Sequence, residues 1–128
     1  MRVINSAQLT FAITCGNGFY APNLTSLAKV PVGTQDGFIK RDLGSADVVV
    51  KSGFTIQMSG TPFGGAPDTC NAIGAGMGAQ AFKAGADPLD PSMTRFFGIN
   101  AMGTIYEDTS SLFATMPEAA LPATGHPL

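Results

Sequence analysis

The apolar residues at the start of the chain recur at intervals of three and four, which predicts a helix over residues 2–15. Gly16 follows it, and glycine is typical of the position just after a helix. Asn5, Gln8 and Thr10 lie off the apolar stripe. The face that we expect to pack on the rest of the domain consists of Ile4, Ala7 and Phe11.

Three further apolar residues of this segment, Val3, Leu9 and Ile13, lie partly off that face. In a domain that acts alone they would be half exposed, unless a loop or the C-terminal tail covered them. In an assembly, the same residues would suit contacts with neighbouring helices. The pattern leaves both interpretations open.

Alternating apolar and polar residues predict strands in the second half of the chain. The clearest is "GFTIQMSG", where Phe54, Ile56 and Met58 share one face. "AQAFKAGADPL", "TRFFGIN" and "GTIYED" predict further strands, and "NAMG" predicts a tight connection between the last two.

The segment between the first helix and these strands reads as a short helix and a loop. Asn23 can cap a short helix in which Leu24, Leu27 and Ala28 face inward. We expect "PVGTQDGFIKRDLGSADVVVKSG" to be loop, with a helical turn around residues 39–43. The tail from 109 to 128 contains three prolines and should run along the surface.

This order of elements predicts one α+β domain over residues 1–128, in which the N-terminal helix packs on a three- to four-stranded antiparallel meander. We divide it into a helix, a helix-loop region, an antiparallel sheet and a Pro-rich tail, over 2–15, 16–52, 53–108 and 109–128.

Composition narrows the possible functions. Only 12% of the residues are charged, compared with about 25% in an average soluble domain, and the net charge is -2. The seven cations are scattered and form no basic patch, so no nucleic-acid partner is predicted. No window holds the roughly 18 consecutive apolar residues of a membrane span. Low charge and abundant small residues suggest a location outside the cytoplasm or packing against copies of the same chain.

Cys15 and Cys70 are the only cysteines. They lie too far apart in sequence for a CxxC motif, and His126 is the only histidine, which argues against a zinc site. Either both are separate buried thiols, or they form a disulfide that ties the end of the first helix to the middle of the chain. A disulfide would stabilise the fold by roughly 3–4 kcal/mol and imply an oxidising compartment.

The sequence contains few residues that could carry out catalysis. Asp87 and Asp90 flank prolines, which is typical of turns, and Asp108 ends a predicted strand. These three aspartates are weak calcium candidates, with solvated turn carboxylates as the alternative. "GAGMG" has no preceding strand and no following helix with a phosphate-binding lysine. We therefore expect no enzymatic activity, no cofactor and no metal.

Several segments in this order resemble the type IV pilin and type II secretion pseudopilin family. "RVINSAQLTFAITCGNGFYAPNLTSLAKV" opens the chain like the globular part of short bacterial pilin-like proteins. "KSGFTIQMSG" and "ADPLDPSMTRFFGINAMGTIYED" follow in the same order, ahead of a Pro-rich close. The resemblance covers most of the chain.

The resemblance implies a structural subunit that assembles into a helical filament through its N-terminal helix. Its partners would be copies of itself and other pilin subunits, at the cell surface or in the periplasm. It also implies that an apolar half-helix, methylated at its N-terminus after leader cleavage, precedes Arg2 and anchors the subunit in the inner membrane before assembly. In the filament, Val3, Leu9 and Ile13 would contact neighbouring subunits.

The alternative is a periplasmic or surface binding or adhesion module of similar shape, without a filament role. Such a module should have a concave apolar pocket lined by some of Phe63, Phe82 and Tyr106.

Overall fold

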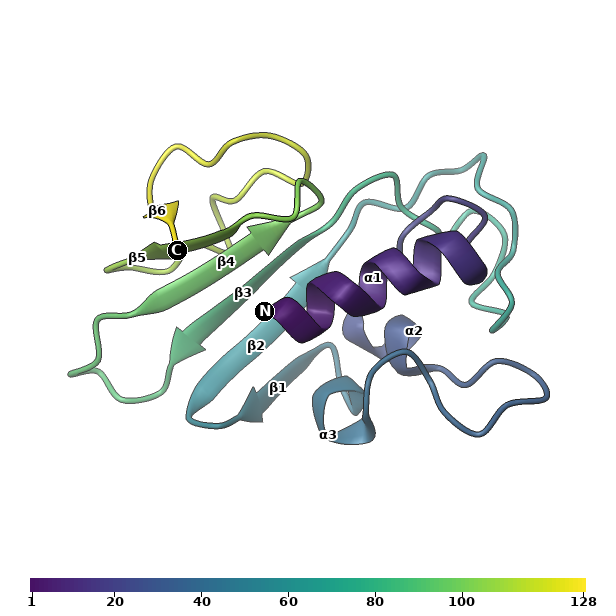
Figure 1. The fold of residues 1–128 in the computed structure, drawn as a ribbon, viewed down its shortest axis with the longest axis horizontal. Helices are drawn as coiled ribbons and strands as arrows, with labels where there is room; N and C mark the ends of the chain where they lie inside the picture. The colour runs from purple at the N-terminus through teal and green to yellow at the C-terminus, as the bar shows by residue number, and fades with distance from the viewer.

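The centre of the molecule is one sheet of six antiparallel strands, which lie side by side in the order of the sequence (Figure 1). The computed structural model describes residues 1–128. The strands are β1 (Val48–Lys51), β2 (Phe54–Ser59), β3 (Lys83–Pro88), β4 (Phe96–Asn100), β5 (Ile105–Asp108) and β6 (His126–Pro127). The helices are α1 (Arg2–Thr14), α2 (Leu24–Ala28) and α3 (Arg41–Gly44).

The predicted three- to four-stranded meander is wrong, because the sheet has six strands. The prediction missed β1 because Val48, Val49 and Val50 are all apolar, so no alternation marks the strand, although only Val49 is buried. It missed β6 because His126 and Pro127 form a two-residue strand that pairs with β5 across a long connection. Local sequence patterns therefore give no signal for β1 or β6, the two edge strands of the sheet.

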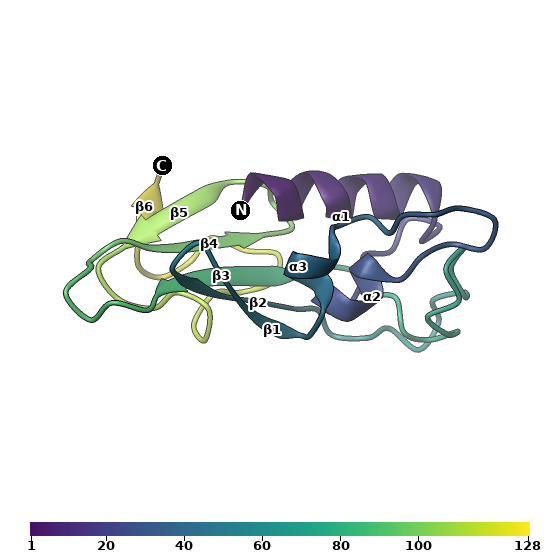
Figure 2. The same ribbon diagram turned by 90° about the horizontal axis from the view of Figure 1, so that it is seen from below.

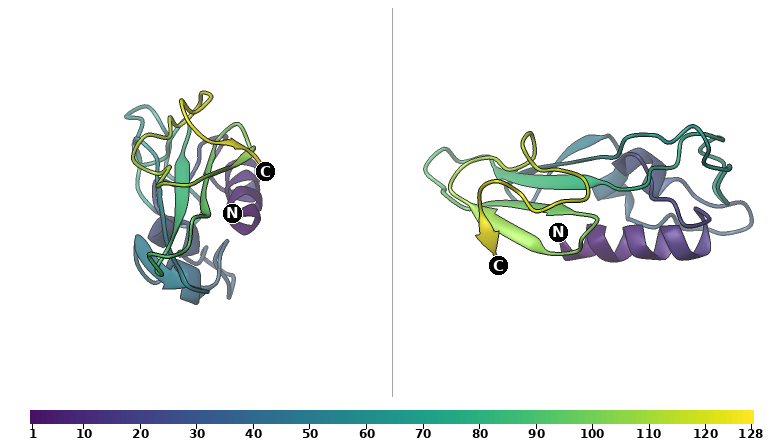
Figure 3. Two further views of the ribbon diagram at one scale, coloured as in Figure 1. Left: turned by 90° about the vertical axis from the view of Figure 1, so that its left-hand side faces the viewer. Right: turned by 90° about the horizontal axis from the view of Figure 1, so that it is seen from above.

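Helix α1 also does not lie along the sheet as predicted. It starts above the middle of the sheet and runs past its end, over α2 and the loop that connects β2 to β3 (Figures 1 and 2). Figure 3 shows from two further sides that the first turn of α1 is the one next to the strands. The helix therefore joins the sheet to the irregular half of the molecule.

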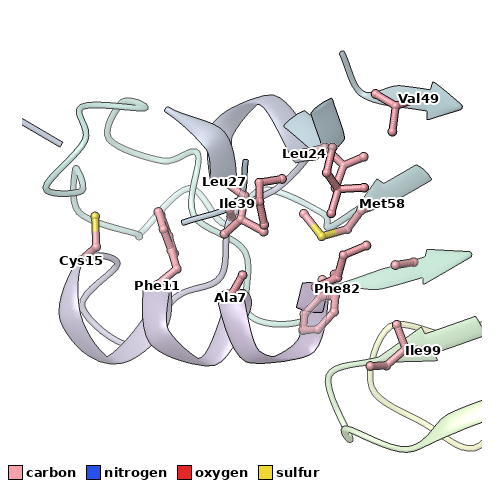
Figure 4. Close-up of a cluster of buried hydrophobic side chains, with 14 residues drawn as sticks. Ala7, Phe11, Cys15, Leu24, Leu27, Ile39, Val49, Met58, Phe82 and Ile99 are labelled. Atoms are coloured by element: carbon pink, nitrogen blue, oxygen red, sulfur yellow. The ribbon is translucent and has the colours of Figure 1, made fainter. Parts of the chain in front are cut away.

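The main core forms where α1, α2 and the sheet meet (Figure 4). Phe11 of α1 is completely buried and packs edge-on against Phe38, with ring centroids 5.2 Å apart. Asn23 caps α2 by accepting a hydrogen bond from the Ser26 backbone, which turns Leu24 and Leu27 inward. The strands and the turn before α3 supply the opposite wall: Ile39, Val49, Met58, Phe82, Ala84 and Ile99.

The tail after β5 covers the other face of the sheet (Figure 2). Gly85 of β3 and Gly98 of β4 are directly paired, and together they leave a notch in that face. Phe113 fits against Gly85, while Leu112 and Met116 fit against Gly98. The tail is therefore part of the packed structure, and small residues in the sheet make this possible.

We predict that Gly85→Ala destabilises the protein by about 1–3 kcal/mol, because the new methyl group would lie 2.7 Å from Cβ of Phe113. Gly64→Ala is the matched control, since no atom lies within 4 Å of a Cβ at that position. Urea unfolding of both variants measures the difference. Equal stability of the two variants would contradict the packing of the tail in the notch.

Candidate functional site

Helix α1 presents one buried face and one exposed apolar face. Ile4 and Phe11 are at most 1% exposed, and Ala7 is also buried. On the opposite side Leu9 is 46% and Ile13 81% exposed, and Val3, on the flank next to Ala7, is 63% exposed. Neither a loop nor the tail covers these three side chains.

The exposed face of α1 is almost free of charge. Ser6 and Thr10 lie between the apolar residues and are exposed, and Arg2 is the only ionisable side chain of the helix. Few charges would lose their water if another apolar surface covered this face. The site can therefore accept a protein partner at a low desolvation cost.

Gln8 fixes the position of the helix from the buried side. Although the sequence places it off the apolar stripe, it is fully buried. Its Nε2 donates a hydrogen bond to the Ala21 carbonyl at 2.8 Å, and its Oε1 accepts one from the Ala21 N–H at 2.9 Å. The side chain thus pairs with the backbone like a neighbouring strand. The one sequence signal for this role is its position four residues after Ile4, at the edge of the buried arc.

A disulfide between Cys15 and Cys70 anchors the end of α1. The backbone supports this link, since the Cys70 N–H donates to the Cys15 carbonyl at 3.1 Å. The adjacent Asn71 is buried, and its Nδ2 donates to the carbonyls of Ser26 and Lys29. The loop after β2 is therefore attached both to α1 and to α2.

An apolar groove of about 460 Å³ lies beside the first turn of α1. Its floor is the face of the sheet that α1 leaves uncovered, since the helix starts near the middle of the strands (Figure 1). Ten of its thirteen lining residues are hydrophobic. The hydrophobic sheet residues among them are Phe54, Ile56, Ala86, Phe97 and Ile105.

A second groove, of about 560 Å³, runs between the exposed face of α1 and the backbone at Gly37 and Phe38. Val3, Ser6 and Thr10 form its helix side. The opposite wall is closely packed, because a Cβ at Gly37 would lie 2.1 Å from the Ala28 carbonyl oxygen. The exposed helix face thus borders a groove with a rigid wall.

The calcium candidates do not form a site together. Asp87 accepts a hydrogen bond from Ser111, Asp90 binds the backbone and hydroxyl of Ser92, and the side chain of Asp108 accepts from the Thr109 N–H. No group of three or more His, Cys, Asp or Glu side chains is close enough to hold a metal ion.

The main ionic cluster lies near the β6 edge of the sheet and joins the residue before β4 to β5 and β6. Arg95 donates a hydrogen bond to Glu107, and His126 lies 3.6 Å from the second carboxylate oxygen. The hydrogen bond from Arg95 holds the pKa of Glu107 below its usual value, against the opposing effect of burial, with a smaller contribution from His126. The short strand β6 pairs with β5 beside this cluster.

The aromatic residues proposed for a ligand pocket are not brought together. Phe82 is buried in the main core, and Tyr106 is buried with Leu112 and Met116 under the tail. Phe63 is 40% exposed and stacks on Phe19 in the loop after β2. The main apolar groove is lined by other residues.

We predict that Gln8→Met lowers the free energy of unfolding by about 1–3 kcal/mol, because the new side chain fills the space but leaves the Ala21 N–H and C=O unpaired. Ser6→Ala is the control on the exposed face of the same helix. Chemical denaturation measures both. A Gln8→Met variant as stable as Ser6→Ala would show that the two hydrogen bonds do not hold α1 in place.

Loss of the disulfide should destabilise the fold by about 4 kcal/mol in the chain-entropy model, since it closes a loop with a sequence separation of 55. The Cys15→Ala/Cys70→Ala double variant tests this by urea unfolding. A reductant should lower the stability of the wild-type protein and leave the double variant unchanged. Unchanged stability of the wild-type protein after full reduction would contradict the anchoring role.

The comparisons with known proteins give no relative. No family model matches the chain, and neither a curated protein nor a solved structure is significantly similar to it. None of the three helices is both long enough and apolar enough to span a membrane.

Proposed function

We propose that the chain is the globular part of a structural subunit of a type IV pilus or of a type II secretion pseudopilus. In this role it assembles into a helical filament through α1 and carries out no catalysis. Its partners are copies of itself and other pilin subunits. The subunit is held in the inner membrane before assembly and is then part of a periplasmic or extracellular filament.

The observation that carries the proposal is the pair of opposite apolar faces on α1. A helix at the surface of an isolated domain normally has polar residues on its outer side. Here Val3 and Ile13 are 63% and 81% exposed, on a helix whose only ionisable side chain is Arg2. A filament in which helices pack side by side would bury such a face, and head-to-tail contacts that do not close extend into a filament.

The groove beside the first turn of α1 supports the same proposal. It continues the line of the helix over the uncovered face of β2, β3 and β4 (Figure 1). An apolar helical segment preceding Arg2 would cover Phe54, Ile56 and Phe97, which line this groove. In the proposal this segment also anchors the subunit in the membrane.

Peptide mass spectrometry of filaments sheared from the native cells tests the proposal directly. Abundant peptides of this chain, with an apolar helix at the processed N-terminus, would identify a major pilin. Processed protein that stays in the membrane fraction would indicate a minor pilin or a pseudopilin. An N-terminus from ordinary signal-peptide cleavage, without an apolar helix, would overturn the proposal in favour of a binding or adhesion module.

We predict that Ile13→Asp abolishes filament assembly and leaves the fold intact, because it places a charge on the exposed face that neighbouring helices would bury. Val32→Asp is the control, since Val32 is 89% exposed and lies outside α1, in the loop between α2 and α3. Electron microscopy of surface filaments and thermal unfolding of the purified variants give the two readouts. Normal filaments with Ile13→Asp would contradict the role of this face.

A further inference from the structure

The outer edge of β1 is not paired with another strand, although α3 contacts β1. β1 is the first strand of the sheet, and no other strand or isolated bridge pairs with its outer side. The opposite edge is different, because β6 has two residues and ends in Pro127, which cannot donate a hydrogen bond. Open edges with apolar side chains are templates for pairing with another strand.

The turn after β1 determines which of its backbone groups are free. Ser52 and Gly53 have φ values of 55° and 82°, which makes a tight two-residue hairpin turn. In such a hairpin the flanking pair, Lys51 and Phe54, exchanges hydrogen bonds. Because the pattern alternates, Val49 also bonds to β2, and the N–H and C=O groups of Val48 and Val50 point away from the sheet.

The side chains of this edge are apolar and accessible. Val48 is 54% and Val50 62% exposed, whereas Val49 between them is buried in the core. The charged residues at the two ends, Asp47 and Lys51, have opposite sign. The sequence Asp-Val-Val-Val-Lys is therefore complementary to itself when two copies run antiparallel.

We propose that β1 pairs antiparallel with β1 of a second copy of this chain, so that the two sheets join across a two-fold axis. Outward-pointing residues must face each other, which allows only a few registers. The register with most overlap centres on Val49, and it places Val48 opposite Val50 of the second copy with four backbone hydrogen bonds. It also places Asp47 of each copy opposite Lys51 of the other copy, which makes two pairs of opposite charge.

Both charged groups are able to make this contact. Asp47 uses one carboxylate oxygen, Oδ1, to accept from the backbone and hydroxyl of Thr25, and its other oxygen has no partner. Lys51 donates one hydrogen bond to Asp42 at 2.7 Å and has further N–H groups available. In other registers, charges of like sign would face each other, or Val48 and Val50 would lie opposite residues that do not suit them. Asp47 and Lys51, at the ends of β1, therefore select this pairing.

The contact is small and closes at two copies. A five-residue strand pair buries much less than the roughly 1,000 Å² of a stable interface, so we expect a dissociation constant of about 0.1–1 mM. Being two-fold, it cannot extend a filament by itself. It uses a different surface from α1, and it would link two subunits or two neighbouring filaments. It holds or fails independently of the proposed function.

Amide hydrogen exchange followed by NMR tests the pairing residue by residue in the wild-type protein. Between about 20 μM and about 1 mM protein, exchange of the Val48 and Val50 amides should slow by about twofold to fourfold, in proportion to the loss of monomer, while the Val49 amide stays protected throughout. Unprotected Val48 and Val50 amides at both concentrations would overturn the proposal.

Substitutions at Val50 distinguish pairing of the two β1 edges from nonspecific association. Val50→Pro removes the outward N–H without removing a bond to β2, and Val50→Thr keeps the N–H and the branched side chain. Sedimentation at about 1 mM should show a monomer for Val50→Pro and a monomer–dimer equilibrium for Val50→Thr. Dimers of both variants would overturn the proposal.

A charge exchange tests the register and remains decisive if the proline variant fails to fold. Asp47→Lys and Lys51→Asp each place like charges opposite each other, so each alone should bind itself about tenfold or more weakly. An equal mixture of the two restores both opposite-charge pairs and should recover the wild-type affinity within about threefold. Thermal unfolding confirms that each variant is folded. A mixture that associates no better than its components would overturn the assignment.

Discussion

Helix α1 is held in its position in part because Gln8, the buried polar residue on its inner side, is fully paired. Its amide makes both a donor and an acceptor bond to the backbone of Ala21, which leaves no unpaired group in the core. Two other buried amides have the same role elsewhere. Asn71 binds the carbonyls at the end of α2, and Asn100 binds those of Pro117 and Ala120 in the tail. Long irregular segments are thereby fixed without regular secondary structure.

This arrangement leaves the two faces of α1 with different roles. The inner face is fixed by the core, by Gln8 and by the disulfide from Cys15, so the helix is a rigid support. The outer face has no partner within the chain and carries Val3, Leu9 and Ile13. Rigidity matters for the proposed function, because a surface that is already ordered loses little conformational entropy when it binds. The edge of β1 is a second, smaller surface, at the side of the sheet that lies next to α3 (Figure 1).

Sequence patterns predicted those elements in which local periodicity and burial agree. Residues 2–15 show the helical period of α1, Asn23 provides the cap of α2, and "GFTIQMSG" shows the alternation of β2. They failed where tertiary pairing decides the structure. β1 is a run of valines that shows no alternation, and β6 is a strand only because it pairs with Tyr106 and Glu107. The six-stranded sheet was therefore not predictable from local signals.

The candidate site was predictable to a similar degree. The sequence identified the apolar residues on both sides of α1, but could not tell whether a loop or the tail covers the outer ones. The roles of Gln8, Asn71 and Asn100 were missed because a polar residue reads as exposed unless its backbone partners are known. The notch formed by Gly85 and Gly98 was missed because it depends on the register between β3 and β4.

The central claim is that assembly buries the outer face of α1. Thiol labelling of Ile13→Cys, compared with Val32→Cys, measures this in free subunits and in assembled filaments. Both side chains are more than four-fifths exposed in the isolated chain, at 81% and 89%. We predict that assembly slows labelling at position 13 by about tenfold or more and leaves position 32 unchanged. Equal labelling of position 13 before and after assembly would contradict the claim.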